Sequence, residues 1–100
     1  MSKTNPVYWV YLLASKPRGT LYVGVTNDLS ARVYQHKIGD GAVFTRKYGV
    51  DRLVWMEPFD DIEAAIAQEK RLKRWHRAWK IKIIEERNPD WTDLYETLND

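Results

Sequence analysis

The segment from Val7 to Leu13, VYWVYLL, constrains the fold most, because it is apolar on both of its alternating faces. Its β-branched and aromatic residues favour an extended strand. Successive side chains of a strand point to opposite faces of the sheet, so this segment has no polar face to turn toward water. We therefore predict a central strand in a sheet that is covered on both sides.

Two further strands follow from the sequence pattern. A turn that contains Pro17 and Gly19 leads into residues 21–25, which we predict to pair with the first strand as an antiparallel hairpin. The segment 52–59, RLVWMEPF, predicts a third strand. Proline cannot donate a hydrogen bond to a neighbouring strand, so Pro58 places this strand at the edge of the sheet or marks its end.

Helices are predicted between and after the strands. A cap at Thr26, Asn27 or Asp28 begins a helix. Four residues of that helix share one face: Leu29, Arg32, Val33 and His36. A shorter helical turn is predicted over 42–48, with Gly49 at its end. The chain therefore reads as a mixture of strands and helices, with the first helix following directly on the hairpin.

The longest helix carries a carboxylate in an unexpected place. It is predicted to be capped by Asp60 or Asp61 and presents an apolar stripe of Ile62, Ala65, Ile66 and Leu72. Glu69 falls in the middle of that stripe on a helical wheel. A buried carboxylate is costly unless it is paired or bound to metal. Glu69 is therefore either a ligand for a hard cation or the partner of Lys73 in an i, i+4 ion pair.

Length and composition limit the classes of protein that fit. A chain of 100 residues predicts one small domain, here 1–100 with its core at about 7–94. The absence of cysteine excludes disulfides and thiolate chemistry. No apolar run approaches the roughly 20 residues of a membrane span, and the N-terminus does not resemble a signal peptide. We therefore expect a cytoplasmic protein without membrane contact. We also expect no organic cofactor, and the glycines do not form a phosphate loop.

The charges are segregated along the chain, although the net charge is only +2. The segment 70–82, KRLKRWHRAWKIK, contains seven basic residues and no acidic ones, whereas 83–100 contains six acidic residues. Cations interleaved with Trp75 and Trp79 favour contact with the phosphate backbone of a nucleic acid. The alternative is a solvated helix face whose tryptophans are buried.

Four polar side chains near the hairpin could carry chemistry. Arg32 and His36 lie one helical turn apart, and a guanidinium there could grip a phosphate oxygen and stabilise developing charge. Alternatively, both lie at the wet edge of an amphipathic helix. Tyr11 and Tyr22 are either core aromatics or groups that place a nucleophilic water. A tyrosine base would need its pKa of about 10 lowered by nearby positive charge.

Taken in order, these residues resemble the GIY-YIG nuclease superfamily, and in particular its small stand-alone bacterial members. The two family triplets appear as Trp9-Val10-Tyr11 and Tyr22-Val23-Gly24. The residues that match the family's helix arginine, its histidine or tyrosine position and its metal-binding glutamate are Arg32, His36 and Glu69. The resemblance covers about Val7 to Leu94. Trp9 departs from the family's glycine. The asparagine that many members carry beyond the glutamate is absent, and Asn88 is the nearest one.

The resemblance implies an α+β fold with a three-stranded antiparallel sheet flanked by helices. It also implies phosphodiester hydrolysis with one divalent ion, Mg²⁺ or Mn²⁺. Glu69 would hold the metal, and Arg32 would stabilise the transition state. Tyr11 or Tyr22 would activate or place the water, with help from His36.

The expected substrate is nucleic acid, most simply DNA. Candidate substrate contacts are Gly24, Lys73, Arg74, Arg77 and Lys80. A single small domain leaves no room for a separate specificity domain, so we expect a structure-selective or weakly selective endonuclease in DNA repair or processing. The alternative is a nucleic-acid-binding or protein-interaction module that keeps the fold without catalysis.

Overall fold

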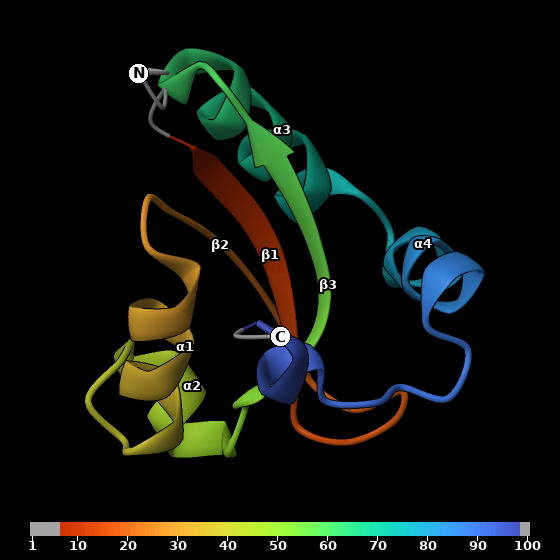
Figure 1. Ribbon diagram of the computed structural model, residues 1–100. Helices are drawn as coiled ribbons and strands as arrows, with labels where there is room; N and C mark the ends of the chain where they lie inside the picture. The colour runs from red at the N-terminus through yellow and green to blue at the C-terminus, as the bar shows by residue number, and fades with distance from the viewer. Residues whose placement is uncertain (1–6, 99–100) are drawn as a thin grey trace.

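The computed structural model describes residues 7–98. Its sheet has three strands, β1 (Tyr8–Ala14), β2 (Leu21–Thr26) and β3 (Arg52–Phe59), in the order β2-β1-β3. Both neighbours of β1 pair with it in the antiparallel sense (Figure 1). The central position predicted for the first strand is therefore confirmed, and β3, which contains Pro58, lies at an edge as expected.

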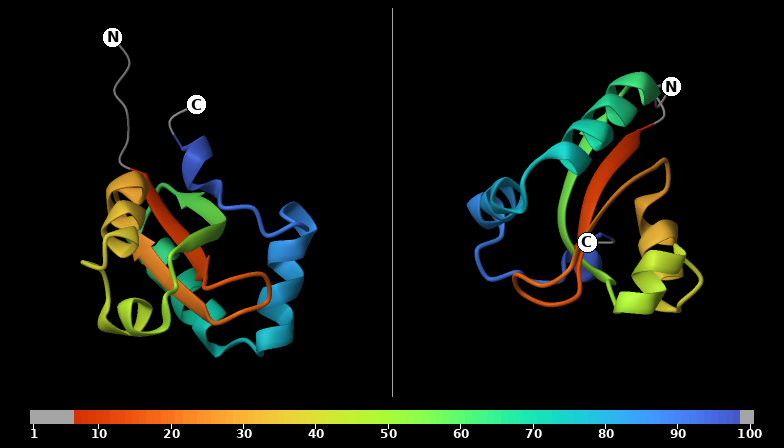
Figure 2. Two further views of the ribbon diagram at one scale, coloured as in Figure 1. Left: turned by 90° about the horizontal axis from the view of Figure 1, so that it is seen from below. Right: turned by 180° about the vertical axis from the view of Figure 1, so that it is seen from behind.

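Helices cover both faces of this sheet. They are α1 (Leu29–Lys37), α2 (Val43–Tyr48), α3 (Ile62–Arg74), α4 (Arg77–Arg87) and the 3-10 helix η1 (Leu94–Thr97). The two ribbon views show α1 and α2 on the opposite side of the sheet from α4 (Figures 1 and 2). The predicted α+β architecture is thus confirmed. None of the helices in residues 7–98 is long and apolar enough to cross a membrane.

The side chains of β1 divide the core into two clusters. Val10 and Leu12 are fully buried in a cluster to which α3 and α4 contribute, whereas Tyr11 and Leu13 are buried in a second cluster with residues of α1. This division explains why the strand has no polar face. Because Tyr11 points toward α1, its hydroxyl meets the side chain of His36 on that helix.

The pairing of β1 with β3 contains one irregularity. Leu12 lies opposite Trp55 and Leu13 lies opposite Leu53, so Val54 has no partner in the register. Such a bulge changes the alternation of side chains along the strand. As a result Val54 and Trp55 are both buried in the cluster of α3 and α4, although they are adjacent in sequence.

Local capping fixes where the helices begin and end. The Asp28 side chain accepts a hydrogen bond from the backbone N–H of Ala31 at 3.2 Å, and α2 ends at Gly49, whose φ of 64° is left-handed. The break between α3 and α4 falls at Trp75, which is extended, and His76. The start of α1 and the end of α2 therefore have local causes, in a side chain and in a backbone angle.

Asp61 caps α3, and its removal should destabilise the fold. Its Oδ2 accepts a hydrogen bond from the N–H of Ala64 at 2.9 Å. We expect Asp61→Ala to lower the free energy of unfolding by about 0.5–2 kcal/mol, because a helix N–H loses its partner. Asp60→Ala is the matched control, since Asp60 is exposed and precedes the cap. Urea unfolding measures both variants, and equal stability of the two would contradict the cap's role.

The C-terminal segment packs back onto the sheet through Asp93. One carboxylate oxygen accepts hydrogen bonds from the backbone N–H groups of Leu53 and Tyr95, both at 3.1 Å. The other pairs with Lys37 of α1 at 2.5 Å. Asp93 thus joins the end of the chain to β3 and to α1, and it helps to hold α1 in place over the sheet.

Candidate functional site

The site begins where the Tyr11 ring crosses Gly24. These two residues are direct partners in the β1–β2 register. A Cβ atom added to Gly24 would lie 2.3 Å from Cζ of Tyr11 and 2.4 Å from its hydroxyl oxygen. No side chain fits there, so the glycine of the second triplet allows the tyrosine of the first to extend across β2. The predicted contact of Gly24 with substrate is a separate matter and stays a prediction.

Gly24→Ala should displace the Tyr11 ring. Because the added methyl group overlaps a buried ring, we expect a loss of about 1–3 kcal/mol in the free energy of unfolding. The same substitution made in a Tyr11→Ala background should cost much less, since the ring is then absent. Chemical unfolding of the four proteins of this double-mutant cycle tests the contact, and additive losses would contradict it.

A chain of hydrogen bonds runs from Tyr11 into α2. The Tyr11 hydroxyl lies 3.2 Å from Nε2 of His36, and Nδ1 of His36 lies 2.9 Å from the Thr45 hydroxyl. That hydroxyl donates its only proton to the carbonyl of Ala42 at 2.9 Å, so it accepts from Nδ1–H of the histidine. Nε2 is then an acceptor, and the Tyr11 hydroxyl donates to it. Gly41 supports the arrangement, because a Cβ there would lie 2.3 Å from Nδ1.

The environment keeps both members of the Tyr11–His36 pair uncharged at neutral pH. Burial raises the pKa of Tyr11 to about 12, against the lowering effect of the nearby Arg32 guanidinium. Burial, followed by Arg32, lowers the pKa of His36 below its usual value. A tyrosine base would need nearby positive charge to lower its pKa. For Tyr11 the cost of burying a phenolate outweighs that effect.

His36 should make stability depend on pH. Its pKa is lowered in the folded state, so the unfolded chain binds more protons as pH falls through the unfolded value of about 6.5. Stability contributed by neutral His36 is therefore present above that pH and is lost as pH falls toward the folded pKa. We expect His36→Gln to reduce the loss of unfolding free energy between about pH 7.5 and 5.

The chain offers a matched control for this measurement. Its other histidine, His76, is exposed at the start of α4. His76→Gln should leave the pH dependence of the wild type in place. If both variants change the pH profile of urea unfolding equally, the buried environment of His36 is not its cause.

Tyr22 and Arg32 lie beside the same pair. The Tyr22 ring centroid lies 6.4 Å from that of Tyr11 and 5.5 Å from that of His36. Nη1 of Arg32 donates to the side chain of Gln35 at 3.1 Å, which orients the guanidinium on α1. The charge of Arg32 lowers the pKa values of both Tyr11 and His36. Four residues predicted to be catalytic are therefore brought together.

Glu69 approaches the site from α3. Its side chain is only 15% exposed and forms an ion pair with the half-exposed Lys73 at 3.0 Å, so the i, i+4 pair considered from the sequence is present. The Glu69 carboxylate also contributes to raising the pKa of Tyr11, which places it within electrostatic reach of that hydroxyl. The ion pair with Lys73 is therefore present, and the role of Glu69 as a ligand for a hard cation stays a prediction.

The donor set at Glu69 fits one hard cation. Among residues 7–98 there is no group of three or more histidine, cysteine or acidic side chains that could hold a metal. Zinc in a closed protein site is disfavoured by such a set, because it takes several histidine or cysteine ligands. A single carboxylate suits Mg²⁺, which usually keeps several waters and takes further ligands from substrate phosphate.

The predicted basic contacts divide into several groups. Lys73 lies beside the site, where it forms an ion pair with Glu69. Arg77 instead donates hydrogen bonds to the backbone carbonyls of Arg18 and Gly19, the latter at 2.6 Å. Arg77 therefore ties α4 to the turn of the hairpin.

Lys80 is half-buried, and burial followed by the charge of Arg77 lowers its pKa. Arg74 is exposed at a hollow of about 400 Å³ along α3.

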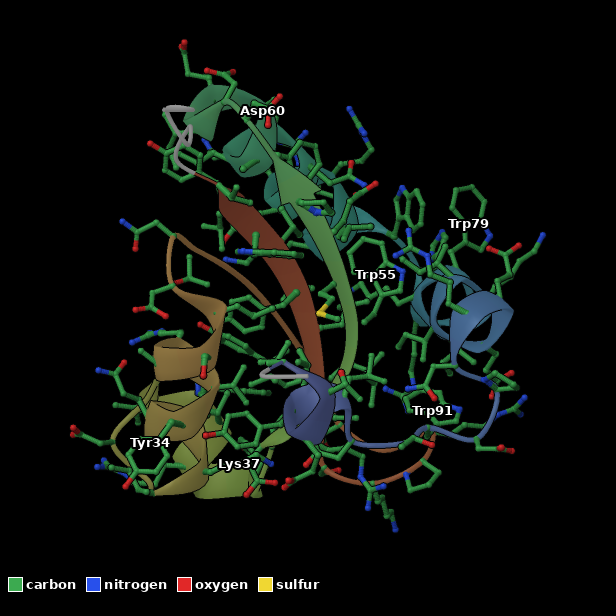
Figure 3. All side chains as sticks on the ribbon, viewed as in Figure 1. Tyr34, Lys37, Trp55, Asp60, Trp79 and Trp91 are labelled. Atoms are coloured by element: carbon green, nitrogen blue, oxygen red, sulfur yellow. The ribbon has the colours of Figure 1, made fainter. Side chains whose placement is uncertain are left out.

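Two residues at α4 bear on questions that the sequence left open, Trp79 on the helix and Asn88 at its end. The side chain of Trp79 is 56% exposed and projects outward (Figure 3), so the alternative of buried tryptophans is wrong for this residue. Asn88 is buried, and its amide nitrogen donates to the carbonyls of Val54 and Thr92 at 3.2 and 2.9 Å. Asn88 thus holds the turn after α4 against β3, on the side of the sheet away from Tyr11.

Sequence reasoning missed Thr45 and Gln35 as parts of the site. Thr45 fixes the tautomer of His36, and Gln35 orients Arg32. The sequence gives no signal for Thr45, because its contact depends on how α2 packs on α1. Gln35 lies three residues after Arg32, and this spacing on a helix is the signal that could have identified it.

Comparison with known proteins places this arrangement in a family. The family model described as GIY-YIG catalytic domain matches residues 7–82. A UPF0213 protein of Bacillus pumilus is 40% identical over 86 residues, 86% of this chain and 85% of the relative. A UPF0213 protein of Haloquadratum walsbyi is 35% identical over 82 residues, 82% of this chain and 91% of the relative.

A solved structure supports the same assignment. The solution NMR structure of a UPF0213 protein from Bacillus halodurans is 30% identical, with a TM-score of 0.54 over 87% of this chain and 92% of that one. The resemblance seen in the two triplets and in Arg32, His36 and Glu69 is thereby confirmed. This chain therefore belongs to the GIY-YIG family of nucleases, and its relatives are small UPF0213 proteins.

Proposed function

We propose that this protein is a divalent-metal-dependent endonuclease that hydrolyses phosphodiester bonds in DNA. The observation that supports it best is the hydrogen-bonded chain from Tyr11 through His36 to Thr45. The charges of Arg32 and Glu69 act on the first hydroxyl of that chain. A tyrosine, a neutral histidine, an arginine and a carboxylate in one place can together supply proton transfer and charge stabilisation for phosphodiester cleavage by water.

Tyr11 and His36 can move a proton together. As the water oxygen forms its bond to phosphorus, the water gives a proton to the Tyr11 oxygen, and the Tyr11 proton passes to Nε2 of His36. The bond from phosphorus to the leaving oxygen breaks, and that oxygen gains a proton from solvent. Burial lowers the pKa of His36, so Nε2 carries no proton at neutral pH and is open to accept one. Thr45 holds Nδ1–H, so that Nε2 always faces the tyrosine.

Glu69 would hold the ion, Mg²⁺ or Mn²⁺, through its carboxylate. When bound, the ion stabilises negative charge on the phosphate oxygens. Arg32 lies on the side of the site formed by α1 and can donate paired hydrogen bonds to the same phosphate. Lys73 is half-exposed on a flexible side chain and can contact substrate beside Glu69. Each group therefore has a role that does not duplicate another.

We further propose that cleavage is structure-selective or weakly selective, as suits DNA repair or processing. The candidate contacts on α3, Lys73 and Arg74, are cations, and cations on phosphate oxygens fix a protein on nucleic acid without reading the base sequence.

A second candidate function is binding without cleavage. Trp79 is exposed within the basic segment 70–82, and Glu69 is occupied by its ion pair with Lys73. Such a module would bind nucleic acid, or another protein, through α3 and α4. It would show affinity that falls steeply with salt and no turnover with metal.

Parallel binding and cleavage assays separate these candidates. Single-stranded, duplex, flap and branched DNA of one sequence are incubated with Mg²⁺, Mn²⁺ or EDTA, and filter binding is titrated with salt. The nuclease predicts products only with metal and more product from some structures than from others. Salt-sensitive binding with no product on any substrate would instead establish the binding module.

A further inference from the structure

Two exposed aromatic side chains lie on α2, outside the residues used above. Phe44 is 44% exposed and Tyr48 is 49% exposed, one helical turn apart. Their ring centroids lie 4.8 Å apart at an angle of 47°. Exposed aromatics that touch each other on a short helix form an apolar surface that water solvates poorly, which makes this surface a candidate for binding.

This surface is continuous with the site. The Phe44 ring is stacked near Tyr22, with centroids 6.4 Å apart and planes at 26°, and Tyr22 lies beside His36. Thr45, the next residue on α2, holds His36 from the inner side of the helix. The row of rings from Tyr48 to His36 is therefore fixed relative to the groups that would act on the phosphate.

The charges around the row suit a nucleic acid strand. Arg46 and Lys47 are exposed on the same helix, and the Lys47 ammonium lies 5.5 Å from the Tyr48 ring centroid. The α2 sequence, VFTRKY, contains no acidic residue. Aromatic rings flanked by cations bind single strands, because bases stack on the rings while the cations contact the backbone.

We propose that Phe44 and Tyr48 form a stacking platform for an unpaired base of the substrate strand, next to the phosphate that is cut. This inference rests on the proposed function and names its substrate class, which is DNA with unpaired nucleotides beside the cleavage site. A fully paired duplex keeps its bases stacked on one another and cannot offer a free face to the rings. Overhangs, flaps and single strands can do so.

Fluorescence anisotropy with three labelled probes tests the platform. The probes are a duplex with a single-stranded overhang, the same duplex with abasic sites in the overhang, and the blunt duplex, all in EDTA so that nothing is cut. The variants are Phe44→Leu and Tyr48→Leu. Tyr34→Leu is the matched control, because Tyr34 is 54% exposed on α1 but has no aromatic contact among the described residues (Figure 3).

The wild type should bind the overhang probe about 5- to 150-fold more tightly than the abasic one, the range expected for base stacking on an aromatic ring. Phe44→Leu and Tyr48→Leu should lose most of that difference, whereas Tyr34→Leu should keep it. Equal affinity of the wild type for the overhang and abasic probes would overturn the platform without depending on how any variant folds. Sedimentation that shows the wild type dimerising through these residues would also overturn it.

The outcomes also separate this inference from the proposed function. DNA that is cut with metal, but bound equally well with or without overhang bases, rejects only the platform. If the wild type neither binds nor cuts any probe, the nuclease assignment itself fails.

Discussion

We expect Glu69→Gln to abolish metal-dependent cleavage while the fold is retained. Glutamine keeps the shape of the side chain but removes the charge that would hold the ion. Residues 7–98 contain no group of three or more histidine, cysteine or acidic side chains that would form a ready-made metal site elsewhere. Loss of partners that merely support a metal ligand already costs about 10–100-fold, so loss of the ligand should cost more than about 100-fold. Turnover of a flap substrate in Mg²⁺ measures the effect.

Stability should change little in this variant. The ion pair lost with Lys73 is an i, i+4 pair whose lysine is half-exposed, and such pairs contribute about 0.3–0.5 kcal/mol. Glu63→Gln is the matched control, because Glu63 is exposed in the first turn of the same helix. Full activity in Glu69→Gln would place the cleavage elsewhere, in another site or in a contaminating enzyme.

Arg32→Ala should have the second large effect. The guanidinium would meet negative charge that grows on the phosphate in the transition state, and removal of one such donor typically costs about 10²–10³-fold in kcat. The loss should fall on kcat more than on KM, because the ground state carries less of that charge. Arg32→Lys should recover only part of the rate, since lysine cannot donate two parallel hydrogen bonds.

Arg87→Ala provides the control for charge in general. Arg87 lies at the end of α4, where its guanidinium contacts the Trp55 ring and donates to the carbonyl of Met56. Its removal lowers the net charge by the same amount but should leave kcat within about twofold of the wild type, because surface substitutions distant from a site have small effects. A similar fall in kcat for both variants would show that Arg32 acts through net charge alone.

Much of the fold could be predicted because its causes are local. The two apolar faces of VYWVYLL required a central strand, and β1 has that position. Asp28 and Asp61 cap the helices that follow them, and Gly49 ends α2. Capping and alternation act over a few residues, so they are readable from the sequence. The bulge at Val54 could not be predicted from the sequence, because it depends on how two distant strands align.

For the candidate site, the sequence predicted several of the residues but not how they are connected. Tyr11, Tyr22, Arg32 and His36 were named from the sequence, and the structure brings them together. Their connection was hidden, because the Tyr11–His36 hydrogen bond joins residues 25 positions apart and Thr45 comes from another helix. Arg77 is the opposite case. It was named from the sequence as a candidate substrate contact, but its guanidinium binds a backbone carbonyl of the hairpin turn.

The pKa of Tyr11 could not be predicted either. The sequence contains Arg32, but it does not show how deeply the Tyr11 hydroxyl is buried in the fold. Burial raises the pKa of Tyr11 to about 12 despite Arg32. A free phenolate is therefore disfavoured at neutral pH, and the hydrogen bond to His36 gives this tyrosine a partner that can take its proton.

The most direct test of the central claim is single-turnover cleavage of a flap DNA as a function of Mg²⁺ concentration, for the wild type and Glu69→Gln side by side. If Glu69 holds the ion, the wild-type rate rises with Mg²⁺ and saturates, and it falls to zero in EDTA, whereas the rate of Glu69→Gln stays at background. DNA binding by the wild type without product at any Mg²⁺ concentration would contradict the claim, as would equal rates for the two proteins.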